Sequence, residues 1–350
     1  MGETAGCLSE QAMKNKIQGI TGIKKAAFIP GAALCQTLRN YTLSRGNGKN
    51  LYYCDLSTGT LKIFLLYKRW RLQIMFDITA SIVVYQNDET ELTAAISSFL
   101  NTNLHVKLFL IDNSPTNALQ KLATDPRISY LFLNKNVGFG AGHNVVLQNS
   151  WESSKYHLVL NPDITFKAGT LEQVFTFMED HPEVGQLLPK VLYESGELQK
   201  LCKLLPTPFD LIIRRLLGNT KIFTKRKQEY ELEHFDYNHT LNIPNLSGCF
   251  MFLRTRVLQK VGLFDTRYFM YLEDVDLTRR IHGVSQTLFF PTVSVVHGYK
   301  KESYKNKTLL NYHISSAIKY FNKWGWVWDP YRSKKNQEVL ERIERLEKQP

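Results

Sequence analysis

The sequence has no run of 18 apolar residues, and no charged, apolar and cleavage-site segments follow one another at its N-terminus. These absences argue against a transmembrane helix and against secretion. Cysteine is scarce, with five residues and no C-x-x-C pair. An odd, scattered set argues against a disulfide framework and a zinc site, and it favours a reducing cytoplasm. No motif of an activated serine or cysteine nucleophile is present.

Positive charge is concentrated near the N-terminus. Residues 1–76 hold 11 Lys and Arg against 3 Asp and Glu, a balance of +8, whereas the other 274 residues hold 33 against 29, a balance of +4. The total charge is therefore a poor argument for nucleic-acid binding, and we expect no nucleic-acid partner. Within the rest of the chain, residues 200–227 form a basic cluster with eight Lys and Arg and a single acid, Asp210.

The two ends of the chain differ from its middle. Residues 1–76 show no regular periodicity, so we expect this N-terminal extension to lie outside the fold, with Met75 as an alternative start of the protein. Residues 321–350 are expected to form an aromatic and charged helical tail, with Trp324, Trp326 and Trp328 close together. Such crowding fits either a membrane interface or packing of a terminal segment on the core.

From Asp77 to about residue 320 the pattern alternates between strands and helices. Strands are expected at 80–85, 107–111, 128–133, 156–160, 249–253, 287–290 and 293–297, and helices at 89–100, 141–148, 170–179, 257–261 and from about 273. Strands separated by helices of roughly ten residues indicate right-handed βαβ units. The sequence therefore predicts an α/β domain with a mostly parallel sheet.

The segment Y-H-L-V-L-N-P-D-I at 156–164 is the most informative. Its apolar run is typical of a strand buried on both faces, and Pro162 ends that strand because proline cannot donate to the ladder. Asp163 is then expected at the carboxyl edge of the sheet, where such folds bind ligands. A carboxylate there suits a divalent metal on a phosphate. The alternative is a strand end with turn-forming Asn161 and Asp163.

Four further features of the sequence could belong to the same ligand site. Val84, Tyr85 and Asp112 bracket a place for a nucleotide base, although such acids also cap loops. Asn136, Gly138 and Gly142 belong to a glycine-rich turn into a helix that could face an anion. The segment at 270–276 places Glu273, Asp274 and Asp276 together, as a general base or as acids favoured at a helix N-terminus. His297 ends an apolar run, as a metal ligand or as a structural histidine.

These segments together resemble the family 2 glycosyltransferases, in particular bacterial rhamnosyltransferase-like enzymes. The matching pieces are S-I-V-V-Y at 81–85, L-I-D-N-S at 110–114, N-K-N-V-G-F-G-A-G-H-N at 134–144, L-N-P-D-I at 160–164, S-G-C-F-M-F-L-R at 247–254, V-G-L-F-D at 261–265, Y-L-E-D-V-D-L at 271–277 and V-V-H-G at 295–298. The resemblance implies a GT-A fold and inverting transfer of a sugar, rhamnose from dTDP-rhamnose being favoured. The acceptor would be a hydroxyl of a glycan or a lipid-linked glycan in polysaccharide synthesis, including O-antigen synthesis.

The resemblance also implies roles for individual residues. Asp163 corresponds to the second acid of the D-x-D motif that holds Mg²⁺ or Mn²⁺, whereas Asn161 replaces the first, so metal binding rests on Asp163 and His297. Asp274 corresponds to the catalytic base, beside Glu273, and Asp112 to the reader of the base. Asp276, Arg214 and Arg215 are expected on the acceptor side. The basic cluster could meet a lipid diphosphate at an anionic membrane, giving a cytoplasmic or peripheral protein.

Two rival functions are considered. A dinucleotide-dependent oxidoreductase would use the glycines at 138–142 with Asp163 as the ribose-binding acid. Their G-x-G-x-G spacing and the unused acids at 273–276 argue against it. A catalytically inactive GT-A scaffold or sugar-binding protein is the other rival, and the presence of Asp163, Glu273 and Asp274 argues against that one.

Overall fold

The structure is a computed structural model that describes residues 76–149, 153–213, 221–298 and 307–348, with the backbone of four strands nearer the N-terminus. The chain divides into two compact units, Met1–Ile74 and Met75–Pro350. The first unit holds an antiparallel sheet of β1 (Ala27–Phe28), β2 (Asn40–Ser44), β3 (Leu51–Asp55) and β4 (Thr60–Lys62). The sequence pattern does not predict these strands. The domain boundaries expected above remain predictions.

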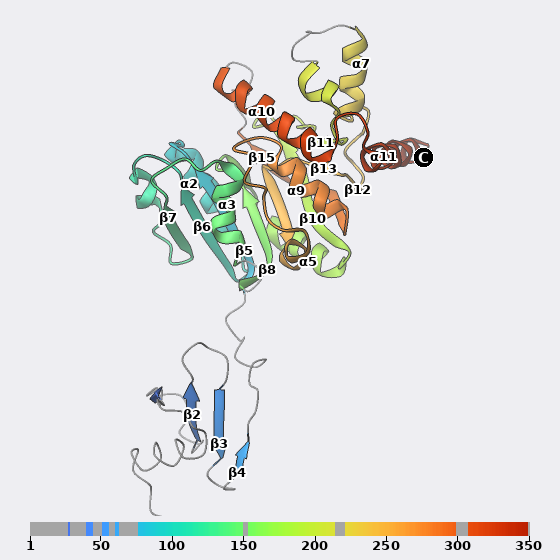
Figure 1. Cartoon of the computed structure of the whole chain (residues 1–350). Helices are drawn as coiled ribbons and strands as arrows, with labels where there is room; N and C mark the ends of the chain where they lie inside the picture. The colour runs from blue at the N-terminus through green and yellow to red at the C-terminus, as the bar shows by residue number, and fades with distance from the viewer. Residues whose placement is uncertain are drawn as a thin grey trace, which may run out of the picture. The chain divides into compact units, whose positions relative to one another are not determined.

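The second unit is built on a mixed, mostly parallel sheet (Figure 1). Its strands run in the order β7-β6-β5-β8-β14-β10-β15-β12, and β9 pairs with β15. Their bounds are β5 (Phe76–Val84), β6 (Val106–Asp112), β7 (Ile128–Phe132), β8 (Ser154–Leu160), β9 (Ile164–Phe166), β10 (Val184–Leu192), β12 (Leu241–Asn242), β14 (Phe250–Arg254) and β15 (Gln286–His297). Because β14 is antiparallel to β8 and β10, the strands β5, β6, β7, β8, β10 and β15 all share one direction.

Helices cover both faces of this sheet. They are α2 (Glu89–Leu100), α3 (Phe139–Leu147), α5 (Thr170–Asp180), α8 (Thr255–Val261) and α9 (Glu273–His282), with a short 3₁₀ turn η2 (Ala118–Leu122). In β8, Leu158 and Leu160 join the larger apolar cluster, which includes α2 and α5, whereas Val159 joins a second one with α3, α8 and α9. Alternate side chains of one strand thus pack on opposite layers, as expected for a strand buried on both faces.

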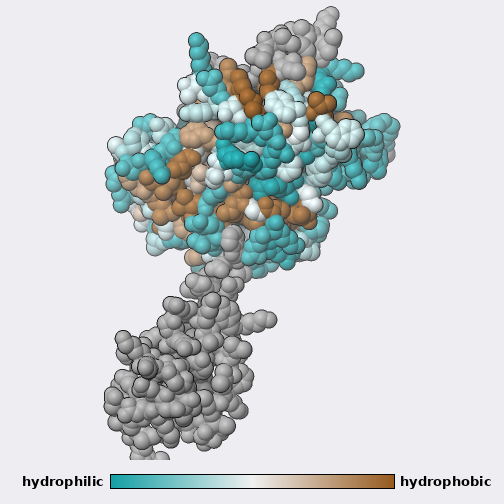
Figure 2. Space-filling view, in the orientation of Figure 1, coloured by the Kyte–Doolittle hydropathy of each residue, from teal (hydrophilic) through white to brown (hydrophobic). Residues whose placement is uncertain are grey.

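Further elements complete the described part of this unit. They are β11 (Cys202–Lys203), paired with β13 (Asn245–Leu246), the π-helical turn η3 (Phe209–Ile213), α7 (Lys221–Tyr230), α10 (Lys307–Trp324) and α11 (Pro330–Glu347). Tyr320 and Phe321 of α10 and Val339 and Ile343 of α11 are buried in the larger cluster. In Figure 2, apolar side chains also reach the surface along the upper edge, where Figure 1 places α10.

The predicted mostly parallel α/β sheet with C-terminal helices is confirmed. Two details differ. The strands expected at 287–290 and 293–297 are one strand, β15, with a register shift against Pro189 and Lys190 of β10. Sequence analysis also missed β10, which contains a proline, and α10. Among the described residues, no helix is long and apolar enough to cross a membrane.

Candidate active site

The shared strand direction brings the predicted site residues to one edge of the sheet. Tyr85 follows β5, Asp112 ends β6, Asp163 follows β8, and His297 ends β15. Gly248 lies two residues before the antiparallel strand β14, whose first residues therefore lie at this edge too. In open α/β folds this carboxyl edge is where ligands bind. The fold thus gathers residues that are more than 200 positions apart in the sequence into one region.

Asp163 and His297 are neighbours because β9 pairs with β15, which sets Ile164 opposite His297. The Asp163 carboxylate Oδ2 lies 3.5 Å from His297 Nε2, and Gly298 N donates to Asp163 O at 3.0 Å. Burial lowers the pKa of His297, although the charge of Asp163 opposes this shift. The imidazole is therefore neutral near pH 7, which is the form that binds metals.

Gln199 determines which nitrogen of His297 carries the proton. Its Nε2 donates to the carbonyl oxygens of His297 at 3.0 Å and Leu192 at 3.4 Å, which fixes the orientation of the amide. Gln199 Oε1 consequently faces His297 Nδ1 at 3.0 Å, and an amide oxygen can only accept. Nδ1 is then the donor, and the lone pair of Nε2 points toward Asp163. Two acceptors facing each other in this way suit a cation, and an outer amide that orients the imidazole is typical of metal ligands.

Asp274 is joined to this region through the start of β14. The Gly248 amide donates to Asp274 Oδ2 at 2.8 Å, and Asn161 N donates to Cys249 O at 2.9 Å. A continuous backbone link therefore runs from Asp274 through Gly248 and Cys249 to the Asn161–Asp163 turn. Burial raises the pKa of the Cys249 thiol, and the charges of Asp163 and Asp274 both add to that shift, which places both carboxylates near Cys249.

Glu273 and Asp274 form a buried pair of carboxyl groups at the start of α9. Burial, followed by the charge of Asp274, raises the pKa of Glu273 to about 8, and Glu273 Oε2 is buried without a hydrogen-bond partner. Burial also raises the pKa of Asp274, while hydrogen bonds from Val275 N and Gly248 N and the charge of Lys203 oppose the rise. Because its pKa is raised to about 8, Glu273 holds a proton at neutral pH, and the charge of Asp274 contributes to this shift.

The residues expected to bind the nucleotide base differ in their exposure to solvent. Val84 is buried, whereas the ring of Tyr85 is half exposed at the end of β5. Asp112 is fully buried, and its carboxylate accepts hydrogen bonds from Ser114 N at 2.8 Å and from the Tyr130 hydroxyl. A pyrimidine N–H would have to share the Asp112 carboxylate with these two donors. Tyr85 and Phe132, the last residue of β7, are exposed aromatic residues at this edge.

The glycine-rich turn packs closely rather than leaving its amides open. Gly138 N donates to Asn136 Oδ1 at 3.0 Å, and Phe139 N donates to Phe269 O at 3.1 Å. Gly138 has φ +90°, and a Cβ there would lie 2.2 Å from Phe269 O. A Cβ on Gly142 would lie 2.8 Å from a methyl group of Val83. The amides of Gly138 and Phe139 therefore already have acceptors within the protein.

Of the three residues expected on the acceptor side, the structure describes Asp276. The carboxylate of Asp276 is fully buried and is bound by Lys323 at 2.7 Å, Arg280 at 2.9 Å and the Trp324 indole N–H at 2.8 Å. Asp276 therefore fastens α10 to α9. Arg214 and Arg215 lie outside the described residues.

Comparison with known proteins identifies the family. The family model described as "Glycosyl transferase family 2" matches residues 80–262, about half of the chain. The chain belongs to this family. The expectation that the protein is a family 2 glycosyltransferase, and hence an enzyme, is confirmed. The matched segment contains Asp163 and Gly248 but ends before Glu273, Asp274 and His297.

Curated relatives and solved structures agree with this assignment. The chain is 24% identical over 236 residues to the N-acetylglucosaminyl-diphospho-decaprenol L-rhamnosyltransferase of Mycobacterium tuberculosis, covering 64% of this chain and 76% of that protein. It is 24% identical over 252 residues to the rhamnosyltransferase WbbL of Escherichia coli, covering 68% and 90%. A crystal structure of GalNAc-T7 with UDP, GalNAc and Mn²⁺ has a TM-score of 0.51 at 13% identity and covers 77% of this chain and 55% of that one. The GT-A fold is thereby confirmed.

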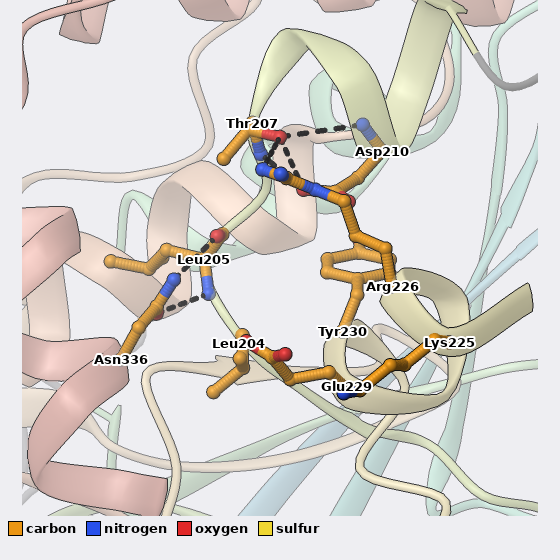
Figure 3. Close-up of a pocket in the computed structure, with 9 residues that line it drawn as sticks. All are labelled: Leu204, Leu205, Thr207, Asp210, Lys225, Arg226, Glu229, Tyr230 and Asn336. Atoms are coloured by element: carbon orange, nitrogen blue, oxygen red, sulfur yellow. Dashed lines mark hydrogen bonds and ion pairs between the residues drawn. The ribbon is translucent and has the colours of Figure 1, made fainter. Parts of the chain in front are cut away.

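A pocket lies beside this glycosyltransferase centre (Figure 3). Its volume is about 350 Å³, and it is lined by Leu204, Leu205, Thr207, Asp210, Lys225, Arg226, Glu229, Tyr230 and Asn336. The amide of Asn336 holds both the N–H and the C=O of Leu205, at 2.8 and 2.9 Å. Lys203 precedes the first lining residue, lies over the Tyr230 ring at 5.8 Å, and lowers the pKa of Asp274 through its charge. Lys203 thus connects the pocket with the carboxylate pair.

Three residues of the site escaped the sequence analysis. Gly248 stood within a motif but had no role assigned, and Gln199 and Lys203 lie in the loop-rich section at 200–245 or just before it. Gln199 meets His297 across 98 positions, and Gly248 meets Asp274 across 26. No local pattern marks such residues, because their roles come from pairing between distant segments.

The approach of Gly248 to Asp274 leads to a first prediction. A Cβ at Gly248 would lie 2.9 Å from Asp274 Cβ, closer than real contacts allow, and 3.1 Å from Oδ2, which is a tight contact. Gly248→Ala should therefore displace the Asp274 carboxylate and lower the turnover number by about a hundredfold, because catalysis tolerates little misplacement. Gly283→Ala at the end of α9, where the nearest atom is 3.4 Å away, is the control. Unchanged kinetics for Gly248→Ala would remove Gly248 from the site.

The raised pKa of Glu273 leads to a second prediction. Between pH 4.5 and about 8 the folded protein holds a proton on Glu273 that the unfolded chain releases. The stability contributed by this group is therefore present at low pH and is lost as pH rises through about 8. Glu273→Gln should gain stability over wild type by up to about 1.4 kcal/mol per pH unit across this window. Denaturant unfolding at pH 6 and pH 8 measures the difference, and parallel pH profiles would contradict a protonated Glu273.

Proposed function

We propose that this glycosyltransferase moves a sugar from a nucleotide-sugar donor to a hydroxyl of a glycan or lipid-linked glycan, in the synthesis of a cell-surface polysaccharide. Rhamnose from dTDP-rhamnose is the favoured donor, because both curated relatives named above are rhamnosyltransferases. The observation that carries the proposal is the backbone link that holds the Asp163–His297 pair and Asp274 at one sheet edge. In this arrangement Asp163 and His297 form the side of the centre for the metal and the donor diphosphate. Asp274 forms the side that accepts a proton.

Asp163 and His297 fit a divalent cation, Mg²⁺ or Mn²⁺. Their donor set is a carboxylate oxygen and an imidazole nitrogen whose protonation Gln199 fixes. No group of three or more His, Cys, Asp or Glu side chains that could hold a metal occurs in the described ranges. The remaining ligand positions would then belong to the donor diphosphate and water, as is usual for Mg²⁺ at phosphates. When bound, such an ion neutralises charge on the departing nucleoside diphosphate.

Asp274 is the proposed general base. It would accept the proton of the acceptor hydroxyl as that oxygen attacks the anomeric carbon, in a single inverting displacement. Burial raises the pKa of Asp274 and so its basicity, while the Gly248 amide fixes the direction of its carboxylate. Protonated Glu273 beside it adds no second negative charge. No protein nucleophile is required.

The pocket in Figure 3 is the proposed acceptor side. Lys203, whose charge acts on Asp274, lies over the Tyr230 ring of this pocket, and Leu204 and Leu205 also line it. Two cations, Lys225 and Arg226, are balanced by two carboxylates, Asp210 and Glu229. This balance favours the hydroxyl groups of a glycan over a diphosphate as the occupant. We further propose that the enzyme works at the cytoplasmic face of an anionic membrane, which would bring it to a lipid-linked acceptor.

A donor panel tests the proposed function. Purified protein is incubated with dTDP-rhamnose, UDP-glucose, UDP-galactose, UDP-N-acetylglucosamine or GDP-mannose, with and without Mg²⁺ or Mn²⁺. Slow hydrolysis of one donor that requires the metal supports the transferase and names its sugar. Binding of a donor without any turnover, in folded protein with metal, would support the inactive scaffold instead.

A further inference from the structure

The turn between α10 and α11 exposes apolar side chains on a rigid support. Val327 is 90% exposed, Trp328 83% and Trp326 40%. Trp324, by contrast, is partly buried and donates to Asp276. Packing on the core, one of the two interpretations of the crowded tryptophans, thus applies to Trp324. Val327 and Trp328 instead point to solvent. We call residues 326–328 the exposed turn.

Buried polar contacts hold this turn in place. Arg279 of α9 forms two hydrogen bonds with Asp329, at 2.7 and 2.8 Å, and both side chains are buried. Asp329 also caps α11 by accepting from Arg332 N at 3.0 Å. The Arg332 guanidinium donates to Val327 O at 3.1 Å. Removing a partner from such a buried network is costly, so the apolar side chains are presented on a fixed backbone rather than on a loose loop.

Gly325 sharpens the bend that exposes these residues. Its φ is +103°, and a Cβ there would lie 2.4 Å from Trp328 O. Any other residue at this position would open the turn. Apolar side chains at the outermost point of a fixed turn cannot fold back onto the core, which makes them a surface for another body.

The charges around the exposed turn indicate the kind of surface it meets. Residues 319–337 contain five Lys and Arg and one acid, Asp329, which is buried against Arg279. Lys334 is exposed in the first turn of α11. Pro206, whose carbonyl accepts from Arg332 Nη1 at 3.4 Å, leads into the pocket, where Lys225 and Arg226 are balanced by Asp210 and Glu229. Of the five cations, Lys323 pairs with Asp265 and Asp276, and Lys335 pairs with Glu338. The positive charge beside the turn therefore comes from Lys319 and Lys334.

We infer that the exposed turn inserts into the surface of an anionic phospholipid bilayer. Tryptophan is enriched at the membrane interface, where its ring is buried and its N–H stays near water. Neighbouring Lys and Arg side chains are attracted to anionic headgroups. A protein partner would need a matching acidic and apolar surface, whereas a bilayer offers both features at once. The inference deepens the proposed membrane contact, and it is tested without donor or turnover.

Vesicle partition of the full-length protein tests this docking element. Vesicles of phosphatidylcholine, with or without phosphatidylglycerol, are mixed with wild type and with a variant carrying Val327→Ser and Trp328→Ser. We expect wild type to bind the anionic vesicles, less so at high salt. The double variant should bind at least about tenfold more weakly, since it loses the burial of two apolar side chains. Val284→Ser, which removes a 56% exposed valine elsewhere, is the control and should bind like wild type.

Several outcomes would overturn the inference. Wild type that does not bind anionic vesicles, or a double variant that binds them equally well, excludes the turn as a lipid contact. A concentration-dependent mass in light scattering that the double variant abolishes would assign the turn to self-association instead. Because these side chains are exposed, thermal unfolding of the variant should match wild type. Donor hydrolysis measured without vesicles separates failure of the lipid contact from failure of the transferase proposal.

Discussion

Asp274→Asn should lower the turnover number by about a thousandfold while leaving donor binding unchanged, because a positioned general base contributes roughly 10²–10⁴. Both carboxylate oxygens of Asp274 accept from backbone amides, Oδ2 from Gly248 N and Oδ1 from Val275 N. An asparagine has the same shape and keeps one of these two bonds. What is lost is the capacity to take the proton of the attacking hydroxyl. Steady-state turnover together with equilibrium donor binding measures both parts of the prediction.

The control for this variant is Asp180→Asn, the same chemical change on the exposed end of α5. It should have wild-type kinetics. If Asp274→Asn retained turnover within a few-fold, the base would have to be another group, and Glu273 would be the first to examine. If it lost donor binding instead, Asp274 would belong to the donor side of the site.

Asp163→Asn should weaken metal-dependent nucleotide binding by more than about a hundredfold, beyond the range usual for an outer residue that only orients a ligand. The substitution keeps the shape of the side chain but removes the negative charge that faces His297 Nε2. Gln199→Leu should have the smaller effect, about 10–100-fold on metal affinity, because it frees the imidazole to rotate or change tautomer. Titration of the metal in the presence of nucleoside diphosphate gives both values.

The most specific part of this prediction is that Asp163→Asn loses more metal affinity than Gln199→Leu. A larger loss for Gln199→Leu than for Asp163→Asn would mean that the pair with His297 is structural. Metal affinity unchanged in both variants would remove the Asp163–His297 pair from the metal site. The fold of each variant is checked by thermal unfolding, since His297 and Gln199 are both buried.

Local sequence signals singled out Asp163 and Asp274 but could not describe their surroundings. The end of β8 at Leu160, two residues before Pro162, was predictable because an apolar run closed by Asn161 and Pro162 is visible in the sequence. The partners of these acids come from β9 pairing with β15 and from β14 pairing with β8, which are contacts between distant segments. Such pairings are determined by the whole fold, so Gly248 and Gln199 could not be singled out beforehand.

Contacts between distant segments also explain why Asp276 and the glycines at 138–142 have other neighbours than their sequence patterns suggested. Asp276 was expected on the acceptor side, yet its carboxylate is buried against Lys323 of α10, a helix that sequence analysis did not predict. The glycines at 138–142 suggested an anion-binding turn, but Gly138 and Gly142 allow close packing on Phe269 and Val83. A short glycine motif indicates that the backbone packs closely against another group. It does not indicate whether that group is a ligand or a side chain of the protein.

Equilibrium binding of dTDP and UDP to the wild-type protein, with Mn²⁺ and then with an excess of chelator, tests the central claim most directly. The account predicts that one of the nucleotides binds with the metal and is released when the metal is removed, because Asp163 and His297 hold the diphosphate only through the ion. Binding that is indifferent to the metal, or no binding in protein shown to be folded, would contradict a metal-dependent transferase centre at this sheet edge.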